Sequence, residues 1–184
     1  GTVLCGWEGV KDLCGKAYFP LSDQDLFPQG STKLNGVKFY GQHSPDEVVS
    51  YTASLIRAAG GGLVPVFDQL LASRSGRVYP VENYRNYGDG GIGGEVEGVP
   101  VLVGTLSFLQ DMGIAVPEGS MIAQAVYVAV DGELSAVYAI SYAKMRSAAA
   151  GLVTLCGYRK LRPLKLCGDF MLTEEFLRSK FNIK

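Results

Sequence analysis

The sequence predicts an α+β protein in which a Rossmann-like α/β unit is interrupted by an inserted domain with an antiparallel sheet. Three observations lead to this prediction. Ser44 caps a clearly indicated helix, short β segments broken by glycine turns occupy residues 77–103 and 123–141, and the remaining chain is ordered helix, strand, helix. We therefore expect the inserted domain over residues 37–141, with residues 1–36 and 142–184 as the two parts of the α/β unit.

The composition is that of a folded protein. Of 184 residues, 47% are hydrophobic and 19% are charged, so the chain can bury a substantial core. The net charge of −1 gives no electrostatic footprint for nucleic acid. No apolar run reaches the ~18–20 residues of a membrane span, which predicts a soluble chain. The start at Gly1 rather than Met indicates a piece of a longer protein.

The cysteines do not indicate a metal site. None of the four belongs to a Cys-x-x-Cys pair, and the chain has a single histidine, so we expect no zinc site. The pattern predicts reduced thiols in a cytoplasmic protein, where each cysteine acts as a small buried hydrophobic residue.

The first half of the chain predicts one short strand and two helices. Residues 17–21 favour a strand, and the polar residues Ser22–Asp25 predict the turn that ends it. Ser44 is followed by proline and, three residues after the cap, by glutamate, which is the pattern of a capping box. That helix should end at the glycines 60–62, and a second helix is expected over residues 65–73.

The middle of the chain predicts a sheet. Residues 77–103 show no helical period and are broken by glycines. Thr105 can cap a short helix. The apolar runs 123–130 and 133–141 flank Asp131-Gly132, a dipeptide typical of tight hairpin turns.

The end of the chain predicts a helix over residues 145–156, a strand over 163–167, and a last helix capped by Thr173 with two glutamates in its first turn. An α/β unit without later strands leaves a sheet edge exposed. We therefore expect self-association through the strand at 163–167.

Several segments resemble the cytoplasmic domains of heavy-metal-transporting P-type ATPases, which belong to the haloacid-dehalogenase-like superfamily. Residues 94–104 are similar to part of the Gly-x-Gly-x-x-Gly-x-Val-x-Gly motif of that family's nucleotide-binding domain and to the strand after it. Residues 126–140 resemble the hairpin before the hinge, and residues 166–169 resemble the Leu-Thr-Gly-Asp motif. The resemblance also includes residues 1–13, 16–21 and 146–156.

This resemblance implies a nucleotide-binding domain inserted in a partial phosphorylation domain. The parent protein would be membrane-embedded and would transport a heavy-metal cation, with this chain on the cytoplasmic side. ATP and Mg²⁺ are the implied cofactors. The family's magnesium-binding Gly-Asp-Gly-x-Asn-Asp motif, however, is absent from the sequence.

The resemblance places the family's phosphorylated aspartate at Asp23, where a carboxylate would form an acyl phosphate. Counting back from Gly30 instead would place Leu21 there and leave no nucleophile. Asp25 would be the general acid of an Asp-x-Asp phosphotransferase, and Asp169 would face the same cleft. The lysine, threonines and glycine that follow the aspartate in the family are absent, which favours impaired catalysis. The alternative is a plain acidic surface turn.

The nucleotide contacts implied by the resemblance have also changed. Valine replaces the histidine that steadies adenine in the family. One family glycine maps to Asp89, whose carboxylate would repel a triphosphate, or to the glycine before it. The implied contacts are Val64, Pro65, Gly91, Gly94, Gly104 and Thr105.

Three functions follow. The leading hypothesis is the cytoplasmic domain of a P-type ATPase-like transporter that binds ATP weakly or not at all and does not hydrolyse it. The second is a non-catalytic ligand-sensing or protein-interaction module on the same fold, which could bind nucleotide through the turn near Gly91 and Gly94. The third is a small phosphatase that uses Asp23 and Asp25.

Overall fold

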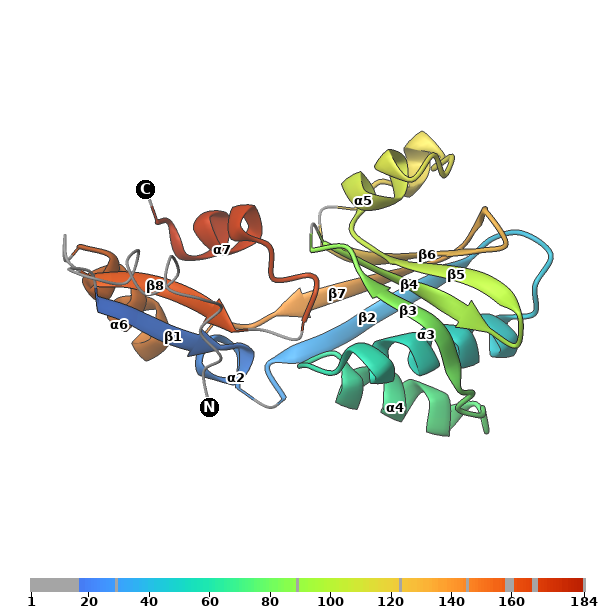
Figure 1. The fold of residues 1–184 in the computed structure, drawn as a ribbon, viewed down its shortest axis with the longest axis horizontal. Helices are drawn as coiled ribbons and strands as arrows, with labels where there is room; N and C mark the ends of the chain where they lie inside the picture. Colours follow the sequence, from blue (N-terminus) through green and yellow to red (C-terminus); the bar gives the residue numbers. More distant parts are fainter. Residues whose placement is uncertain are drawn as a thin grey trace, which may run out of the picture.

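Within the described residues, the chain forms two lobes (Figure 1). The larger lobe comprises residues 32–142, and the smaller lobe comprises the described residues on either side of it. Predictions that concern residues 1–16, Asp89, Cys167 and Gly168 lie outside the described residues. A computed structural model describes residues 17–28, 30–88, 90–122, 124–144, 146–157, 161–166 and 169–183.

A six-stranded antiparallel sheet forms the centre of the larger lobe, and it confirms the predicted α+β class. The predicted hairpin is present, and the φ angles of 52° at Asp131 and 80° at Gly132 give its turn the left-handed geometry that tight hairpins require. The strands lie in the order β2 (Thr32–Phe39), β7 (Glu133–Tyr142), β6 (Ala125–Val130), β5 (Val99–Gly104), β4 (Gly91–Val96) and β3 (Val81–Asn86).

Helices cover both faces of this sheet (Figure 1). The predicted helices α3 (Pro45–Ala59) and α4 (Val64–Ser73) lie on one face, while α5 (Leu106–Asp111) and the short 3-10 helix η1 (Glu118–Ser120) lie on the other. Helix α3 begins where the sequence indicates, because the hydroxyl of Ser44 accepts a hydrogen bond from the Glu47 amide at 3.3 Å.

The sheet separates two hydrophobic clusters. Val126 packs into the cluster that contains α3 and α4, whereas its neighbour Tyr127 packs into the cluster that contains α5. Because successive side chains of a strand point to opposite faces, every residue of β6 is buried. The larger lobe therefore has a core on each side of its sheet.

Two local predictions need correction. The polar residues Ser22–Asp25 do not form a turn, because the Ser22 hydroxyl caps a short helix, α2 (Asp23–Leu26). Strand β2 was not expected; its residues are at most half-buried, and the register of its pairing with β7 shifts between Leu34 and Gly36. The predicted boundary after residue 36 falls inside β2, and the domain boundaries remain predictions.

The smaller lobe contains a parallel pair of strands, β1 (Ala17–Ser22) and β8 (Leu161–Leu166), with helices α6 (Arg146–Gly157) and α7 (Glu174–Phe181). These elements confirm the predicted helix–strand–helix order. Helix α7 begins at its predicted cap, because the Thr173 hydroxyl accepts a hydrogen bond from the amide of Phe176. None of the described helices is both long enough and apolar enough to cross a membrane.

Aromatic side chains join the two lobes. The ring of Phe27 lies 5.1 Å from that of Tyr142, the last residue of β7, and 5.6 Å from that of Phe181. Phe176 completes this group, with its ring 5.3 Å from Tyr142. The larger lobe thus ends inside an aromatic cluster to which α7 contributes two rings.

Candidate functional site

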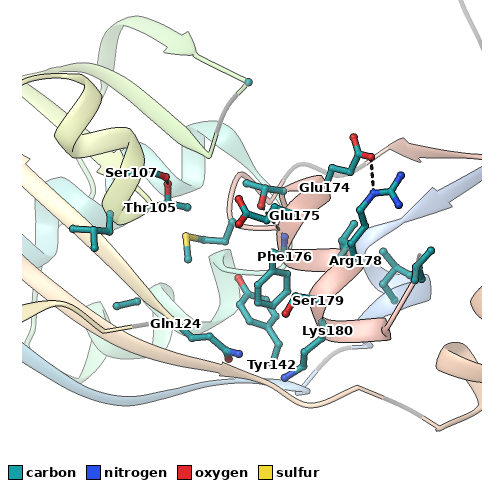
Figure 2. A pocket seen from close by; sticks show the side chains of 18 of the residues that line it. Thr105, Ser107, Gln124, Tyr142, Glu174, Glu175, Phe176, Arg178, Ser179 and Lys180 are labelled. Carbon is teal, nitrogen blue, oxygen red and sulfur yellow. Dashed lines mark hydrogen bonds and ion pairs between the residues drawn. The ribbon is translucent and has the colours of Figure 1, made fainter.

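A cleft of about 1400 Å³ lies between the lobes. Helix α7 forms one wall, the residues around α5 form the other, and Tyr142 lies between them (Figure 2). Its polar lining comes from Thr105, Ser107, Gln110, Asp111 and Gln124 in the larger lobe and from Thr173, Glu174, Glu175, Arg178, Ser179 and Lys180 in the smaller lobe.

The charges of this cleft do not favour a polyphosphate. Asp111, Glu174 and Glu175 contribute carboxylates, and Arg178 and Lys180 contribute the cations. The guanidinium of Arg178 is already engaged, because its Nε donates to Glu174 Oε1 at 2.8 Å. A triphosphate needs an excess of positive charge, which this lining lacks. The charges of the cleft therefore do not favour a highly charged anion.

Two of the predicted catalytic carboxylates meet where the loop between α3 and α4 reaches the smaller lobe. Asp23 Oδ2 accepts a hydrogen bond from the Gly62 amide at 3.1 Å. A Cβ atom added to Gly62 would lie 4.0 Å from Asp169 Oδ2. Asp23 and Asp169 thus flank one glycine of the larger lobe.

Asp169 is held as a buried hydrogen-bond acceptor. It is 2% exposed, and its Oδ2 accepts from the Tyr142 hydroxyl at 2.8 Å while its Oδ1 accepts from the Met171 amide at 2.8 Å. Burial raises the pKa of the Tyr142 hydroxyl, and the Asp169 carboxylate raises it further. The hydroxyl therefore keeps its proton and remains a donor.

Asp25 is engaged by the capping box of α2. Its Oδ2 accepts from the Ser22 amide at 2.8 Å and from the Ser22 hydroxyl at 2.7 Å. These hydrogen bonds lower the pKa of Asp25. A general acid must hold a proton near neutral pH, and a lowered pKa opposes this. The geometry gives Asp25 a capping role.

The predicted nucleotide-binding glycines are packed against protein side chains. A Cβ atom at Gly91 would lie 2.2 Å from the ring of Phe108, and one at Gly104 would lie 2.4 Å from the same ring. At Gly94 it would lie 2.7 Å from Val81 Cγ1. Close packing therefore explains why glycine stands at each of these positions.

The other predicted nucleotide contacts are placed apart. Val64 begins α4 and packs against the main hydrophobic cluster, and Pro65 beside it is exposed. Thr105 lines the cleft, where its hydroxyl caps α5 and its amide donates to the Gly90 carbonyl at 2.8 Å. Of the six predicted contacts, only Thr105 contributes to the cleft within the described part of the chain.

Sequence reasoning missed three contributors to this region. Gly62 and Tyr142 bind the two predicted carboxylates, and residues 170–172 pack into the larger lobe directly after Asp169. The apolar run Phe170-Met171-Leu172 after an aspartate was the available signal, since such a run is expected to be buried. No comparable sequence pattern marks Gly62 or Tyr142 as a contact of these carboxylates.

The described residues do not fit the implied Mg²⁺ or ATP. No group of three or more His, Cys, Asp or Glu side chains in the described ranges could hold a metal ion. Oxygens of Asp23 and Asp169 instead accept hydrogen bonds from the protein. Side chains fill the space beside the predicted glycines, and the cleft lacks the positive charge for a triphosphate.

Comparison with known proteins identifies the fold. No family model matches the sequence, and neither does any curated protein sequence. The N-domain of HMA6, a copper-transporting P-type ATPase, superposes with a TM-score of 0.50 at 19% identity, and the match covers 61% of this chain and 100% of that domain.

A second solved structure matches both lobes. The catalytic domain of the CPx-ATPase CopB-B superposes with a TM-score of 0.55 at 14% identity over 99% of this chain, which spans 64% of that domain. The protein therefore has the fold of the nucleotide-binding domain of heavy-metal P-type ATPases, as its sequence predicted.

Proposed function

We propose that this chain belongs to the cytoplasmic part of a heavy-metal P-type ATPase-like membrane protein and does not hydrolyse ATP. The observation that carries the proposal is the match to the CopB-B catalytic domain over 99% of this chain, because it includes the smaller lobe as well as the larger. Residues 37–141 would then be the nucleotide-binding-like domain, and residues 1–36 and 142–184 parts of a haloacid-dehalogenase-like phosphorylation domain.

The carboxylate environments support a pseudoenzyme. Asp23, the proposed counterpart of the phosphorylated residue, accepts a hydrogen bond from Gly62, and Asp169 accepts hydrogen bonds from Tyr142 and Met171. No lysine or threonine follows Asp23 to stabilise a transferred phosphoryl group. The whole protein would move a metal ion or regulate such movement.

A hydrolysis assay tests this proposal. We expect the chain with ATP and Mg²⁺ to release phosphate no faster than its Asp23→Asn variant. Asp25→Asn is the matched control, since it removes a neighbouring carboxylate that the capping box already engages. Turnover that is lost in Asp23→Asn would refute the proposal. Its retention in Asp25→Asn would then indicate an ATPase that depends on Asp23, and its loss in both variants would restore the phosphatase that uses both carboxylates.

A nucleotide titration tests the cofactor. We expect backbone amide shifts at residues 88–94 and at Val64 to show weak binding or none with up to about 10 mM ATP or ADP, with and without Mg²⁺. Saturation well below 1 mM would mean that the fold retains a nucleotide site despite its replaced residues.

The mixed charges of the cleft favour a second candidate, a non-catalytic module that senses a polar ligand or binds a protein. Glu175 and Lys180 give α7 one carboxylate and one ammonium beside the Glu174–Arg178 pair. Substitution of Glu175 and Lys180 together by alanine should abolish such binding without unfolding the chain. If an identified ligand bound this double variant as tightly as the wild type, this surface would be excluded as its binding site.

A further inference from the structure

Three apolar residues of the smaller lobe are buried against the larger lobe. Phe170 is 7% exposed, Met171 is 6% exposed and Leu172 is fully buried. All three belong to the hydrophobic cluster that forms the main core of the larger lobe. This contact places side chains of the smaller lobe inside the core of the larger lobe.

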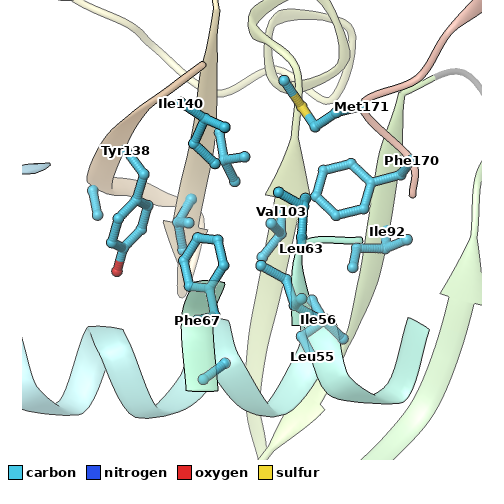
Figure 3. Packing of buried hydrophobic residues seen from close by; sticks show 14 of the residues in the cluster. Leu55, Ile56, Leu63, Phe67, Ile92, Val103, Tyr138, Ile140, Phe170 and Met171 are labelled. Atoms are coloured by element: carbon cyan, nitrogen blue, oxygen red, sulfur yellow. The ribbon is translucent and has the colours of Figure 1, made fainter. Parts of the chain in front are cut away.

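Figure 3 shows where this segment lies. The ring of Phe170 lies beside Ile92 of β4 and Val103 of β5, with Leu63 next to them and Met171 above. The following residue continues the contact: a Cβ atom at Gly90 would lie 3.2 Å from the Thr173 methyl. The segment therefore crosses the ends of two neighbouring strands and the beginning of α4.

The residues covered by this segment are chain neighbours of predicted nucleotide contacts. Leu63 precedes Val64, Ile92 follows Gly91, and Val103 precedes Gly104. Because neighbouring residues of a strand point to opposite faces, Ile92 and Val103 belong to the cluster that holds the segment, whereas Phe108 of the other cluster fills the space beside Gly91 and Gly104. The segment therefore covers these strand ends on the face of the sheet that carries α3 and α4.

Hydrogen bonds through Asp169 connect residues 170–172 to the end of β7. Asp169 accepts the Met171 amide through Oδ1 at 2.8 Å and the Leu172 amide through its carbonyl at 3.2 Å. Tyr142, the last residue of β7, donates to the same aspartate. The backbone of the segment is therefore anchored to the strand that links the two lobes.

We propose that residues 170–172 form an intramolecular plug that holds the lobes closed and covers a surface formed by Ile92 and Val103 at the ends of β4 and β5 and by Leu63 before α4. A base can reach that surface only after the plug has left. The closure does not depend on the proposed function, whereas its consequence for nucleotide does rest on it. The lobes must therefore separate before the larger lobe can bind any planar ligand at this surface.

Amide hydrogen exchange of the full chain tests the closure. In Phe170→Ala we expect the Met171 and Leu172 amides to exchange at least about tenfold faster than in the wild type, while the β6–β7 ladder keeps its protection. Leu134→Ala is the control, because Leu134 is equally buried at 7% exposure but lies in the other cluster. Leu134→Ala should leave the exchange rates of the Met171 and Leu172 amides within about threefold of the wild-type rates.

Two outcomes of the exchange experiment would contradict the proposal. Unchanged Met171 and Leu172 exchange in Phe170→Ala, or an equal acceleration in Leu134→Ala, would overturn the plug. Titration of both variants with ADP then separates the two proposals. Binding at least about tenfold tighter in Phe170→Ala supports plug and nucleotide role together. Faster exchange without binding up to about 10 mM supports the plug and rejects the nucleotide role.

Discussion

The larger lobe completes its own core, whereas the smaller lobe shares one. Six antiparallel strands with helices on both faces give the larger lobe two hydrophobic clusters. In its described residues, the smaller lobe has a two-stranded parallel sheet, and its buried hydrophobic residues, such as Leu26, Phe27 and Leu152, all belong to the larger lobe's main cluster. Two strands alone are marginally stable in water.

This difference teaches that the lobes are not equivalent folding units. A parallel pair normally needs cover on both faces, and here aromatic side chains around Tyr142 and the segment 170–172 supply contacts to the larger lobe. We therefore expect the smaller lobe to lose its structure whenever the interface fails, and the larger lobe to survive that loss.

The largest effect should come from the complete core. Phe67 of α4 is 1% exposed, and its ring lies 5.0 Å from that of Tyr138. Phe67→Ala should reduce the free energy of unfolding by about 3–5 kcal/mol, measured by urea denaturation. Phe19→Ala is the control, since Phe19 of β1 is 40% exposed and should cost less than about 1 kcal/mol. Equal costs would mean that burial of Phe67 in this core does not determine the cost.

The next effect should separate the lobes. Phe27 is 6% exposed and contacts Tyr142 and Phe181. Phe27→Ala should cost about 2–4 kcal/mol and expose the amides of α7 to hydrogen exchange, while the β6–β7 hairpin stays protected. Phe27→Leu should keep most of the protection. Simultaneous loss of protection in both lobes would mean that they unfold as one unit.

Local signals made much of the fold predictable. Ser44 marked the start of α3 because a cap acts on residues within one turn, and Asp131-Gly132 marked the hairpin because the turn geometry selects those residues. Strand β2 escaped notice because its side chains are at most half-buried and its register against β7 shifts between Leu34 and Gly36. An edge strand with weak alternation gives little signal.

The candidate site was less predictable because its contacts are distant in sequence. Asp23 was placed at a strand end, and the structure also ends β1 directly before it. Its partner Gly62 is 39 residues away, and Tyr142 lies 27 residues from Asp169. No local pattern specifies such a pair. The plug at residues 170–172 likewise depends on how the lobes close, which only the three-dimensional arrangement shows.

A smaller effect should come from the hydrogen bond that links the lobes. Tyr142→Phe removes the hydroxyl that donates to the buried Asp169 carboxylate. The free energy of unfolding should fall by about 1–3 kcal/mol, because a buried acceptor loses a partner. Tyr40→Phe is the control, since the Tyr40 hydroxyl bonds Ser120 within the larger lobe. Only Tyr142→Phe should speed exchange of the Met171 amide; equal acceleration in both would contradict the link.

The smallest effect should be confined to α2 and should depend on pH. Because hydrogen bonds from Ser22 lower the pKa of Asp25 below its ordinary 3.8, the unfolded chain binds this proton more readily than the folded chain. The stability that Asp25 contributes is therefore present above pH 3.8 and is lost as the pH falls through the lowered pKa. Asp25→Asn should cost about 0.5–1 kcal/mol at pH 7 and remove this acid-dependent loss.

Ser22→Ala supplies the matched test of that capping box. It deletes the hydroxyl that both accepts from the Asp25 amide and donates to the Asp25 carboxylate. Since the two residues act as one unit, the double variant should cost little more than either single variant. Exchange at α2 should accelerate in all three, while β6 amides remain unchanged. Additive costs, or parallel stability curves for wild type and Asp25→Asn between pH 5 and 2, would show that Asp25 is an exposed acidic residue without a capping role.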